Sequence, residues 1–414
     1  MSKRLINVVC LVLLAILLAA LPGLVGCAKE KEEVQEIVYG FLWDFTGRAA
    51  LGVKQFYDGM MDYLRMTEEE EPISGVKITV TTYDTKSETG RVPIGYKWLK
   101  GHGAVFMSAA PQDTELLRSQ FEADEIPFFC GSEIASLLDS KWSFFLFPPV
   151  KCQVEVLMHW IMDTWDYGKG KPKIGLVSLS GVPFYEEQRD TAEALYEAYP
   201  EGFESFKAEM SPVGTMTWAT EIRRLMDSDF IIATMSGPPL AAFTKEARDR
   251  GYENRLIAPF ESYWSYWSLI KGAVPPQALD GIVTSSYQPL WDDPVPFISQ
   301  LKEYVLTYRP GDAEALFETS GQITGWATGV VLVDVVRRAV EEAGAEKIDG
   351  RVLRDALTET DIDMTAEGFG NIWKVNLAED INCFVQTIKL YQYGAAEDEW
   401  VAVSDWIRPP SLGD

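Results

Sequence analysis

The sequence predicts an α/β protein built from two doubly wound, Rossmann-like lobes. The first observation is a regular alternation of short β-branched and aromatic runs with longer helical stretches, which is typical of right-handed βαβ units. The second is that this alternation restarts after Pro148-Pro149, so that two α/β halves of similar size follow each other. The third is the length of 414 residues, which favours two lobes over one.

In the first half, apolar periodicity sets the order of the elements. The helix expected over 55–66 places Phe56, Met60 and Tyr63 near one face. The stretch 144–150 contains the two prolines and is expected to cross between the lobes rather than to form part of a core. The expected strands are 37–43, 76–83, 104–107 and 127–129, and the expected helices are 55–66, 92–99 and 114–123.

The second half repeats the pattern and is followed by segments that are candidates for a return to the first lobe. These segments are 282–286, a helix over 296–308 and a long helix over 323–343. Within the second half, the expected strands are 174–179, 205–209, 230–235 and 255–258, and the expected helices are 153–165, 186–199, 220–226 and 240–250.

The N-terminus carries the features of an export signal. Lys3 and Arg4 precede an uncharged run over 8–21, which is too short for a membrane span of roughly 20 residues. Leu24-Val25-Gly26-Cys27 resembles the bacterial lipobox, which implies removal of 1–26 and lipidation of Cys27 ahead of a tether over 27–35. The alternative is an uncleaved N-terminal anchor helix. The lipobox interpretation predicts an extracytoplasmic protein held at the membrane by lipid.

Composition argues against several classes of function. A formal net charge of −25 repels phosphate, so nucleic acid is not an expected partner. Two histidines and scattered cysteines predict no metal site and no other cofactor. Whether Cys130 and Cys152 pair stays open. Common hydrolase and nucleotide-binding motifs are lacking, so no catalytic residue is predicted; a hydrolase using carboxylates such as Asp44, Glu133 and Glu261 is a less favoured alternative.

Several local motifs resemble those of type I periplasmic binding proteins, specifically the branched-chain amino-acid branch of ABC-transporter solute receptors. They are Gly40-Phe41-Leu42-Trp43-Asp44-Phe45-Thr46-Gly47, Ile73-Ser74-Gly75, Tyr83-Asp84 and Pro127-Phe128-Phe129-Cys130-Gly131-Ser132. The resemblance spans about residues 37–403 and implies that three crossings join the lobes. It divides the chain into 36–148 with 284–366 for lobe 1, 149–283 with 367–405 for lobe 2, and a C-terminal tail over 406–414.

The resemblance also implies a ligand site between the lobes. Ser108 and Ser132 stand where this family places carboxylate-binding hydroxyls, although both also suit ordinary helix N-caps. Tyr185 stands where the family often has a closing tyrosine, with Phe184 as the other register. Phe260 occupies the place of the family's ammonium-binding glutamate and Glu261 is one residue displaced, so leucine, isoleucine and valine are expected to bind weakly. The full set of expected contacts is Trp43, Asp44, Ser108, Gly131, Ser132, Tyr185, Ser236 and Glu261.

The aromatic run Tyr263-Trp264-Ser265-Tyr266-Trp267 has two interpretations, a packed core or a wall of the ligand site. The family implied by the motifs predicts a lipid-anchored solute receptor that captures a small amino-acid-like, amide or aromatic polar ligand by closure of the lobes. Its expected partners are ABC permease subunits. A ligand-sensing receptor of the same fold is the alternative from another class.

Overall fold

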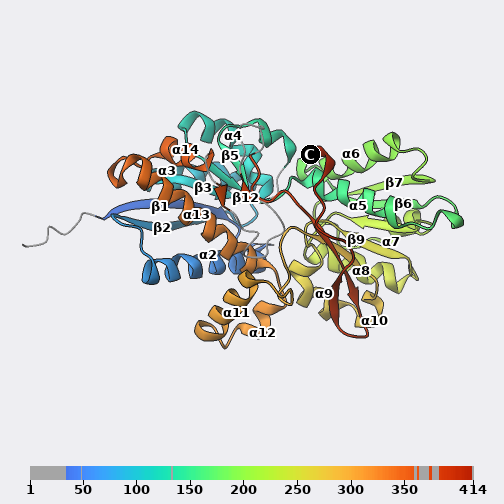
Figure 1. Cartoon of the computed structure of the whole chain (residues 1–414). Coiled ribbons are helices and arrows are strands. Elements are labelled where there is room, and N and C mark those ends of the chain that lie inside the picture. The colour runs from blue at the N-terminus through green and yellow to red at the C-terminus, as the bar shows by residue number, and fades with distance from the viewer. Residues whose placement is uncertain are drawn as a thin grey trace, which may run out of the picture.

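Two α/β lobes lie side by side in the computed structural model (Figure 1). The structure describes residues 34–47, 49–131, 134–358, 361–362, 373–374 and 382–412. Among these residues, no helix is both long and apolar enough to span a membrane. The predicted signal and Cys27 lie outside the described residues.

The first lobe is built on a parallel sheet of the order β2-β1-β3-β4-β5. Apart from the edge strand β2, in which polar residues alternate with apolar ones, its strands are largely apolar and buried because helices cover the sheet. The strands are β1 (Gln35–Trp43), β2 (Val76–Asp84), β3 (Ala104–Ala109), β4 (Phe128–Cys130) and β5 (Ser143–Phe145), with helices α2 (Ala50–Glu70), α3 (Val92–Gly101) and α4 (Pro111–Asp124) between them.

The prediction that 144–150 is only a crossing is wrong in part. Residues 143–145 form β5, which pairs in parallel with β4 as the last strand of the first sheet. Phe144 and Phe145 are fully buried there. The chain crosses to the second lobe only after this strand, at Pro148-Pro149, because proline lacks the N–H that a further strand pairing needs.

The second lobe repeats the strand order of the first and adds two antiparallel strands. Its sheet has the order β14-β13-β10-β9-β8-β6-β7. The strands are β6 (Lys173–Ser180), β7 (Ser205–Pro212), β8 (Phe230–Ala233), β9 (Arg255–Ala258), β10 (Val283–Ser286), β13 (Lys389–Gly394) and β14 (Glu399–Ala402). The helices are α5 (Val150–Thr164), α6 (Pro183–Ala198), α7 (Ala219–Leu225), α8 (Pro238–Asp249), α9 (Trp267–Ala273) and α10 (Pro276–Leu279).

The segment 282–286 does not return to the first lobe as expected. It forms β10, which pairs in parallel with β9 and antiparallel with β13. The expected boundary between 283 and 284 therefore falls inside a strand of the second sheet. The reason is tertiary: Val283–Ser286 are fully buried between two neighbouring strands, which a four-residue pattern does not reveal.

The chain returns to the first lobe after β10, as the long helix shows. Helices α11 (Pro296–Tyr308), α12 (Ala313–Phe317), α13 (Gly321–Ala343) and α14 (Gly350–Thr358) follow, and then the short strands β11 (Asp361–Ile362) and β12 (Trp373–Lys374). Helix α13 packs along α2, as Figure 1 shows. Glycines permit the close approach, because a β-carbon on Gly325 would lie 2.0 Å from the carbonyl oxygen of Phe56.

Three crossings join the lobes, which confirms the predicted fold class. They follow β5, β10 and α14, and the last one brings the chain to β13. The first and last crossings run together, because the N–H of Phe384 donates to the carbonyl of Phe145 at 2.9 Å. Cys130 and Cys152 are not joined by a disulfide. The predicted tail is packed at residues 406–412, where the N–H of Ile407 donates to the carbonyl of Ile388.

Candidate functional site

Both sheets have a topological switch point, where neighbouring strands send their connections to opposite sides. In lobe 1 this point lies between β1 and β3, and in lobe 2 between β6 and β8. Ligands of open parallel sheets bind beyond the carboxyl ends of the strands at such points. Trp43 and Ser108 lie there in lobe 1, and Tyr185 and Ser236 lie there in lobe 2.

Trp43 and Ser108 are held together across the switch point of lobe 1. Trp43 ends β1, and its indole Nε1 donates to the hydroxyl of Ser108 at 3.0 Å. The indole stacks on Phe41 and meets the ring of Phe56 edge-on. Ser108 is 2% exposed. The hydroxyl of Ser108 therefore holds the half-buried indole in place. The rings of Trp43, Phe41 and Phe56 make this side of the switch point aromatic.

Asp44 binds its own turn. Its carboxylate accepts the N–H of Ala49 at 3.0 Å and also bonds to the N–H of Gly47 and the hydroxyl of Ser87. The side chain is 2% exposed. The expected role of this residue as a direct ligand contact thus competes with a structural one, although its negative charge remains at the site.

Asp113, which the sequence did not single out, lies close to Asp44. It is the third residue of α4, which begins shortly after β3, and it is 4% exposed. Burial, and then the negative charge of Asp44, raise the pKa of Asp113 to about 6. The only signal in the sequence was an acidic residue in the first turn of a helix, which is a common feature of helix N-termini.

In lobe 2, α6 begins with a run of aromatic residues. Tyr185 is half-buried in its first turn, and its ring meets Phe184 edge-on. Phe184 in turn stacks on Phe260, with 5.0 Å between ring centroids. Phe260 and Phe184 pack against a cluster of lobe 1 that includes Ile134 and Leu137. These two rings therefore lie at the junction between the lobes.

Tyr266 reaches across to lobe 1. Its hydroxyl oxygen lies 3.5 Å from where a β-carbon would sit on Gly52, and its ring lies 3.4 Å from the same point on Gly237. Burial, with smaller contributions from Tyr185 and Asp44, raises the pKa of Tyr266 to about 12. The rest of the aromatic run is core, since Tyr263, Trp264 and Trp267 are at most 5% exposed. Ser236, after β8, is half-buried beside Gly237.

Glu261 is turned away from the switch points and into the crossings. It is 0% exposed, and its carboxylate accepts the Gln288 amide at 3.0 Å and the hydroxyl of Ser286. Gln288 also donates to Thr324 of α13 at 2.9 Å. Burial raises the pKa of Glu261 to about 7, against the lowering effect of these hydrogen bonds. The structure therefore does not bring this carboxylate together with the other expected contacts.

A second contact between the lobes involves α6 and the short 3-10 helix η3 (Ala135–Asp139). Both carboxylate oxygens of Glu187 lie within hydrogen-bond distance of the N–H of Ala135, at 3.0 and 3.1 Å. An open groove of about 430 Å³ runs beside this contact. It is lined by Ile134, Ser136, Pro183, Glu186, Glu187, Asp190, Thr191 and Ala194.

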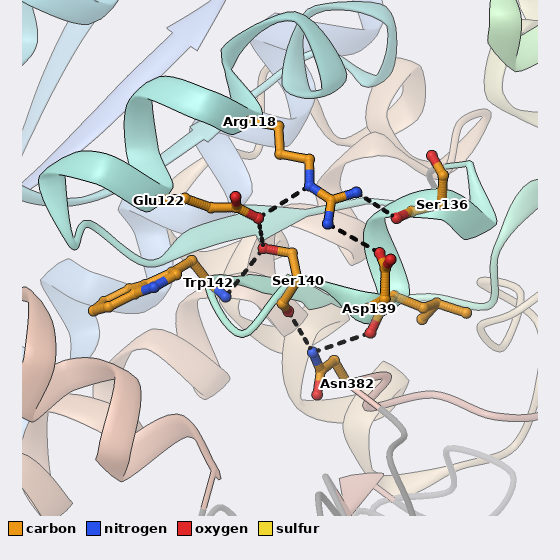
Figure 2. Close-up of polar contacts among 8 residues, drawn as sticks. Arg118, Glu122, Ser136, Asp139, Ser140, Trp142 and Asn382 are labelled. Carbon is orange, nitrogen blue, oxygen red and sulfur yellow. Dashed lines mark hydrogen bonds and ion pairs between the residues drawn. The ribbon is translucent and has the colours of Figure 1, made fainter.

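Arg118 and Asn382 hold η3 in place (Figure 2). The guanidinium of Arg118 donates to the carbonyl of Ser136 at 2.8 Å and pairs with Glu122 and Asp139. On the other side, the amide of Asn382 donates to the carbonyl of Ser140 at 2.8 Å. The turn that Glu187 contacts is therefore tied both to α4 and to the last crossing.

Of the remaining expected contacts, Gly131 follows β4 and its carbonyl accepts the N–H of Phe147 at 3.4 Å. Ser132 lies outside the described residues. In the described ranges, no group of three or more His, Cys, Asp or Glu side chains is arranged to hold a metal ion.

Two α/β lobes, each with one switch point, and three connecting crossings define a two-lobed protein of doubly wound sheets. Residues 36–393 match the model of a family described as periplasmic binding protein. The chain therefore belongs to the periplasmic binding protein family, as its motifs indicated. No curated protein sequence matches it significantly.

Solved structures share the fold at low sequence identity. A branched-chain amino-acid ABC transporter protein from Thermus thermophilus with bound valine has a TM-score of 0.78 and 15% identity, over 91% of this chain and 98% of that one. A fatty acid ABC transporter substrate-binding protein from Thermomonospora curvata has a TM-score of 0.75 and 15% identity, over 91% and 94%. A solute-binding protein from R. palustris in complex with benzoate has a TM-score of 0.73 and 16% identity, over 92% and 99%.

Proposed function

We propose that this protein is an extracytoplasmic, lipid-anchored solute-binding protein of an ABC importer. It captures a small amino-acid-like, amide or aromatic polar ligand between its lobes and presents it to permease subunits in the membrane. The observation that carries the proposal is the position of Tyr266, whose ring lies beside Gly237 of lobe 2 and whose hydroxyl lies 3.5 Å from where a β-carbon would sit on Gly52 of α2 in lobe 1. The lipobox ending at Cys27 supports the location.

The arrangement suits capture by closure of the lobes. Trp43 and Ser108 approach from one sheet, and Tyr185, Ser236 and Tyr266 approach from the other. A ligand that contacts both sets stabilises the closed arrangement by its differential affinity for it. The similar structures from Thermus thermophilus and R. palustris carry valine and benzoate, and both compounds are small, which supports a small ligand here.

A thermal-shift screen over amino acids, amides, aromatic acids, amines and short peptides tests the proposal, because a ligand that binds only the folded state raises its apparent stability. We expect one class of compound to raise the melting temperature in this screen, and we expect leucine, isoleucine and valine to bind only weakly. Calorimetry with a positive compound should then show roughly tenfold weaker binding for Tyr185→Ala. Tyr167→Ala, an exposed tyrosine of the same lobe, is the matched control. Unchanged affinity in Tyr185→Ala would contradict the placement of the site.

A further inference from the structure

We infer that the ligand carries a cationic group, an ammonium or quaternary ammonium centre, which binds between the carboxylate of Asp113 and the rings of Trp43, Tyr185 and Tyr266. The inference rests on the proposed function and names the class of its ligand. It differs from the expectation drawn from the motifs, in which Glu261 would take the positive group.

The first observation is a buried carboxylate that lacks a counter-charge. Asp113 is 4% exposed, and among the described residues no hydrogen bond or ion pair reaches its carboxylate. A buried charge is costly unless it is paired. In the part of the chain that the structure describes, the charge that acts on Asp113 is that of Asp44, which has the same sign. A ligand cation would supply the missing partner.

The second observation is the position of this carboxylate in the fold. Leu42 and Ala109 are partners in the register of β1 and β3, so Asp44 and the start of α4 leave the sheet side by side. Asp113 therefore lies one helical turn beyond the switch point of lobe 1. The positive end of the α4 dipole favours an anion, but Asp113 itself occupies this end, so a ligand anion would meet its carboxylate.

The third observation is the aromatic character of the opposite wall. Tyr266 lies near both Asp44 and Tyr185, since both groups contribute, after burial, to the raised pKa of its hydroxyl. Trp43 is half-buried on the lobe 1 side. The faces of such rings attract a desolvated cation by about 0.5 to 2 kcal/mol each. Aromatic rings together with a carboxylate are chemically matched to an alkylammonium group.

The fourth observation argues against Glu261 as the carboxylate that binds the ligand cation. The Glu261 carboxylate is bonded to Ser286 and Gln288 and is 0% exposed, so a ligand cation would have to break these bonds to reach it. Asp113 offers a carboxylate at the strand ends without that cost.

The test compares cations with matched neutral and anionic compounds on the purified full chain. The probes are choline, its uncharged isostere 3,3-dimethyl-1-butanol, phenethylammonium and benzoate. We expect choline or phenethylammonium to raise the melting temperature, and the neutral isostere and benzoate to have no effect. Calorimetry with the positive cation should show at least about tenfold weaker binding for Asp113→Asn. Asp163→Asn, an exposed residue of α5, makes the same change in net charge and should bind as the unmodified protein does.

A second variant keeps the inference testable if Asp113→Asn fails to fold. Tyr266→Leu removes a ring face and should weaken cation binding, whereas Tyr266→Phe keeps the ring and should not. The inference is overturned if neither cation raises the melting temperature, or if Asp113→Asn binds the cation as tightly as the unmodified protein. If benzoate or leucine binds in a way that depends on Tyr185 while the cations do not, the proposed function stands and only this inference fails.

Discussion

At the scale of single residues, the turn after β9 decides which side chain meets the junction between the lobes. Phe260 and Glu261 have φ angles of +62° and +55°, a backbone region that costs non-glycine residues on the order of 1 kcal/mol or more. This conformation directs Glu261 into the network with Ser286 and Gln288, while Phe260 stacks on Phe184. Two adjacent residues thereby take up opposite environments, one a buried polar network and the other an aromatic contact.

The buried carboxylate of Glu261 should make stability depend on pH. Its folded pKa of about 7 exceeds the ordinary value of 4.5, so the folded state holds the proton more tightly than the unfolded state between these values. The contribution is present in full below about pH 4.5 and is lost as the pH rises through about 7. We expect Glu261→Gln to remove a slope on the order of 1 kcal/mol per pH unit across this window.

Urea unfolding of both proteins at intervals between pH 4.5 and 7.5 measures this difference. Asp113 also has a raised pKa and affects stability in the same direction. The Glu261→Gln variant therefore keeps part of the slope of the free energy of unfolding against pH. Parallel curves for the two proteins would show that Glu261 titrates as an ordinary glutamate.

At the scale of elements, α6 and η3 form a contact that should matter for closure of the lobes. Glu187 bonds the N–H of Ala135, and η3 is itself held by Arg118 and Asn382 (Figure 2). The turn therefore presents a fixed donor to the other lobe. Burial raises the pKa of Glu187, while its bond to Ala135 acts in the opposite direction.

Removing this carboxylate should weaken the contact between the lobes. Glu187→Ala leaves the N–H of Ala135 without its acceptor, and a hydrogen bond to a charged group contributes about 1.5 to 3 kcal/mol. Ligand affinity measured by calorimetry should fall about tenfold or more, and small-angle scattering should show a larger radius of gyration. Glu193→Ala, an exposed position of the same helix, should change neither quantity. An unaltered affinity in Glu187→Ala would mean that closure does not depend on this contact.

Packing of α13 on α2 depends on small residues. A β-carbon on Gly325 would lie 2.0 Å from the carbonyl oxygen of Phe56, which is backbone and cannot turn aside. Gly325→Ala should therefore destabilise the protein by about 1 to 3 kcal/mol, the usual cost of overpacking. The midpoint of chemical unfolding reports the change.

The matched control for this prediction is Gly101→Ala at the end of α3, where a β-carbon would meet nothing within 4 Å. Alanine is the better helix former, so this variant should be neutral or slightly more stable. Equal effects of the two substitutions would contradict the role of close packing at α13.

At the scale of the whole molecule, the two lobes repeat one strand order around a shared set of crossings. The order β2-β1-β3-β4-β5 in lobe 1 has its counterpart in β7-β6-β8-β9-β10 of lobe 2. In each lobe a switch point therefore lies at the carboxyl ends of the strands, and we propose that the ligand binds between these two ends. The segments β13 and β14 extend only the second sheet.

Attachment of the whole protein to the membrane is proposed to depend on lipid at Cys27. Cys27→Ser removes the thiol that would carry the lipid, and because acyl chains supply the attachment, the variant should appear in the soluble fraction or remain unprocessed. Membrane fractionation with immunoblotting measures this, and Cys152→Ser, a buried cysteine far along the sequence, is the control for loss of any thiol. An unmodified Cys27 in mature, membrane-bound protein, as shown by mass spectrometry, would refute the proposal.

The sequence by itself determined which segments are helices and which are strands in most of the chain, because the apolar periods of 3.6 and 2 are local properties. Helices α4, α6, α8 and α11 even begin at prolines that the sequence shows directly. The motifs around β1 and β4 then indicated the family, which the family model confirms.

Only the tertiary structure decided how these elements combine. The residues 143–145 became a strand because β4 offers a free edge, and 283–286 joined the second sheet because β9 and β13 enclose them. The inward turn of Glu261 depends on Ser286 and Gln288, which are more than twenty residues away. The effect of Asp44 on Asp113 depends on the register of β1 and β3, which brings the two segments to the same edge of the sheet. Each of these outcomes depends on contacts between segments that are distant in sequence. A local sequence pattern does not reveal which distant segment will pack against it.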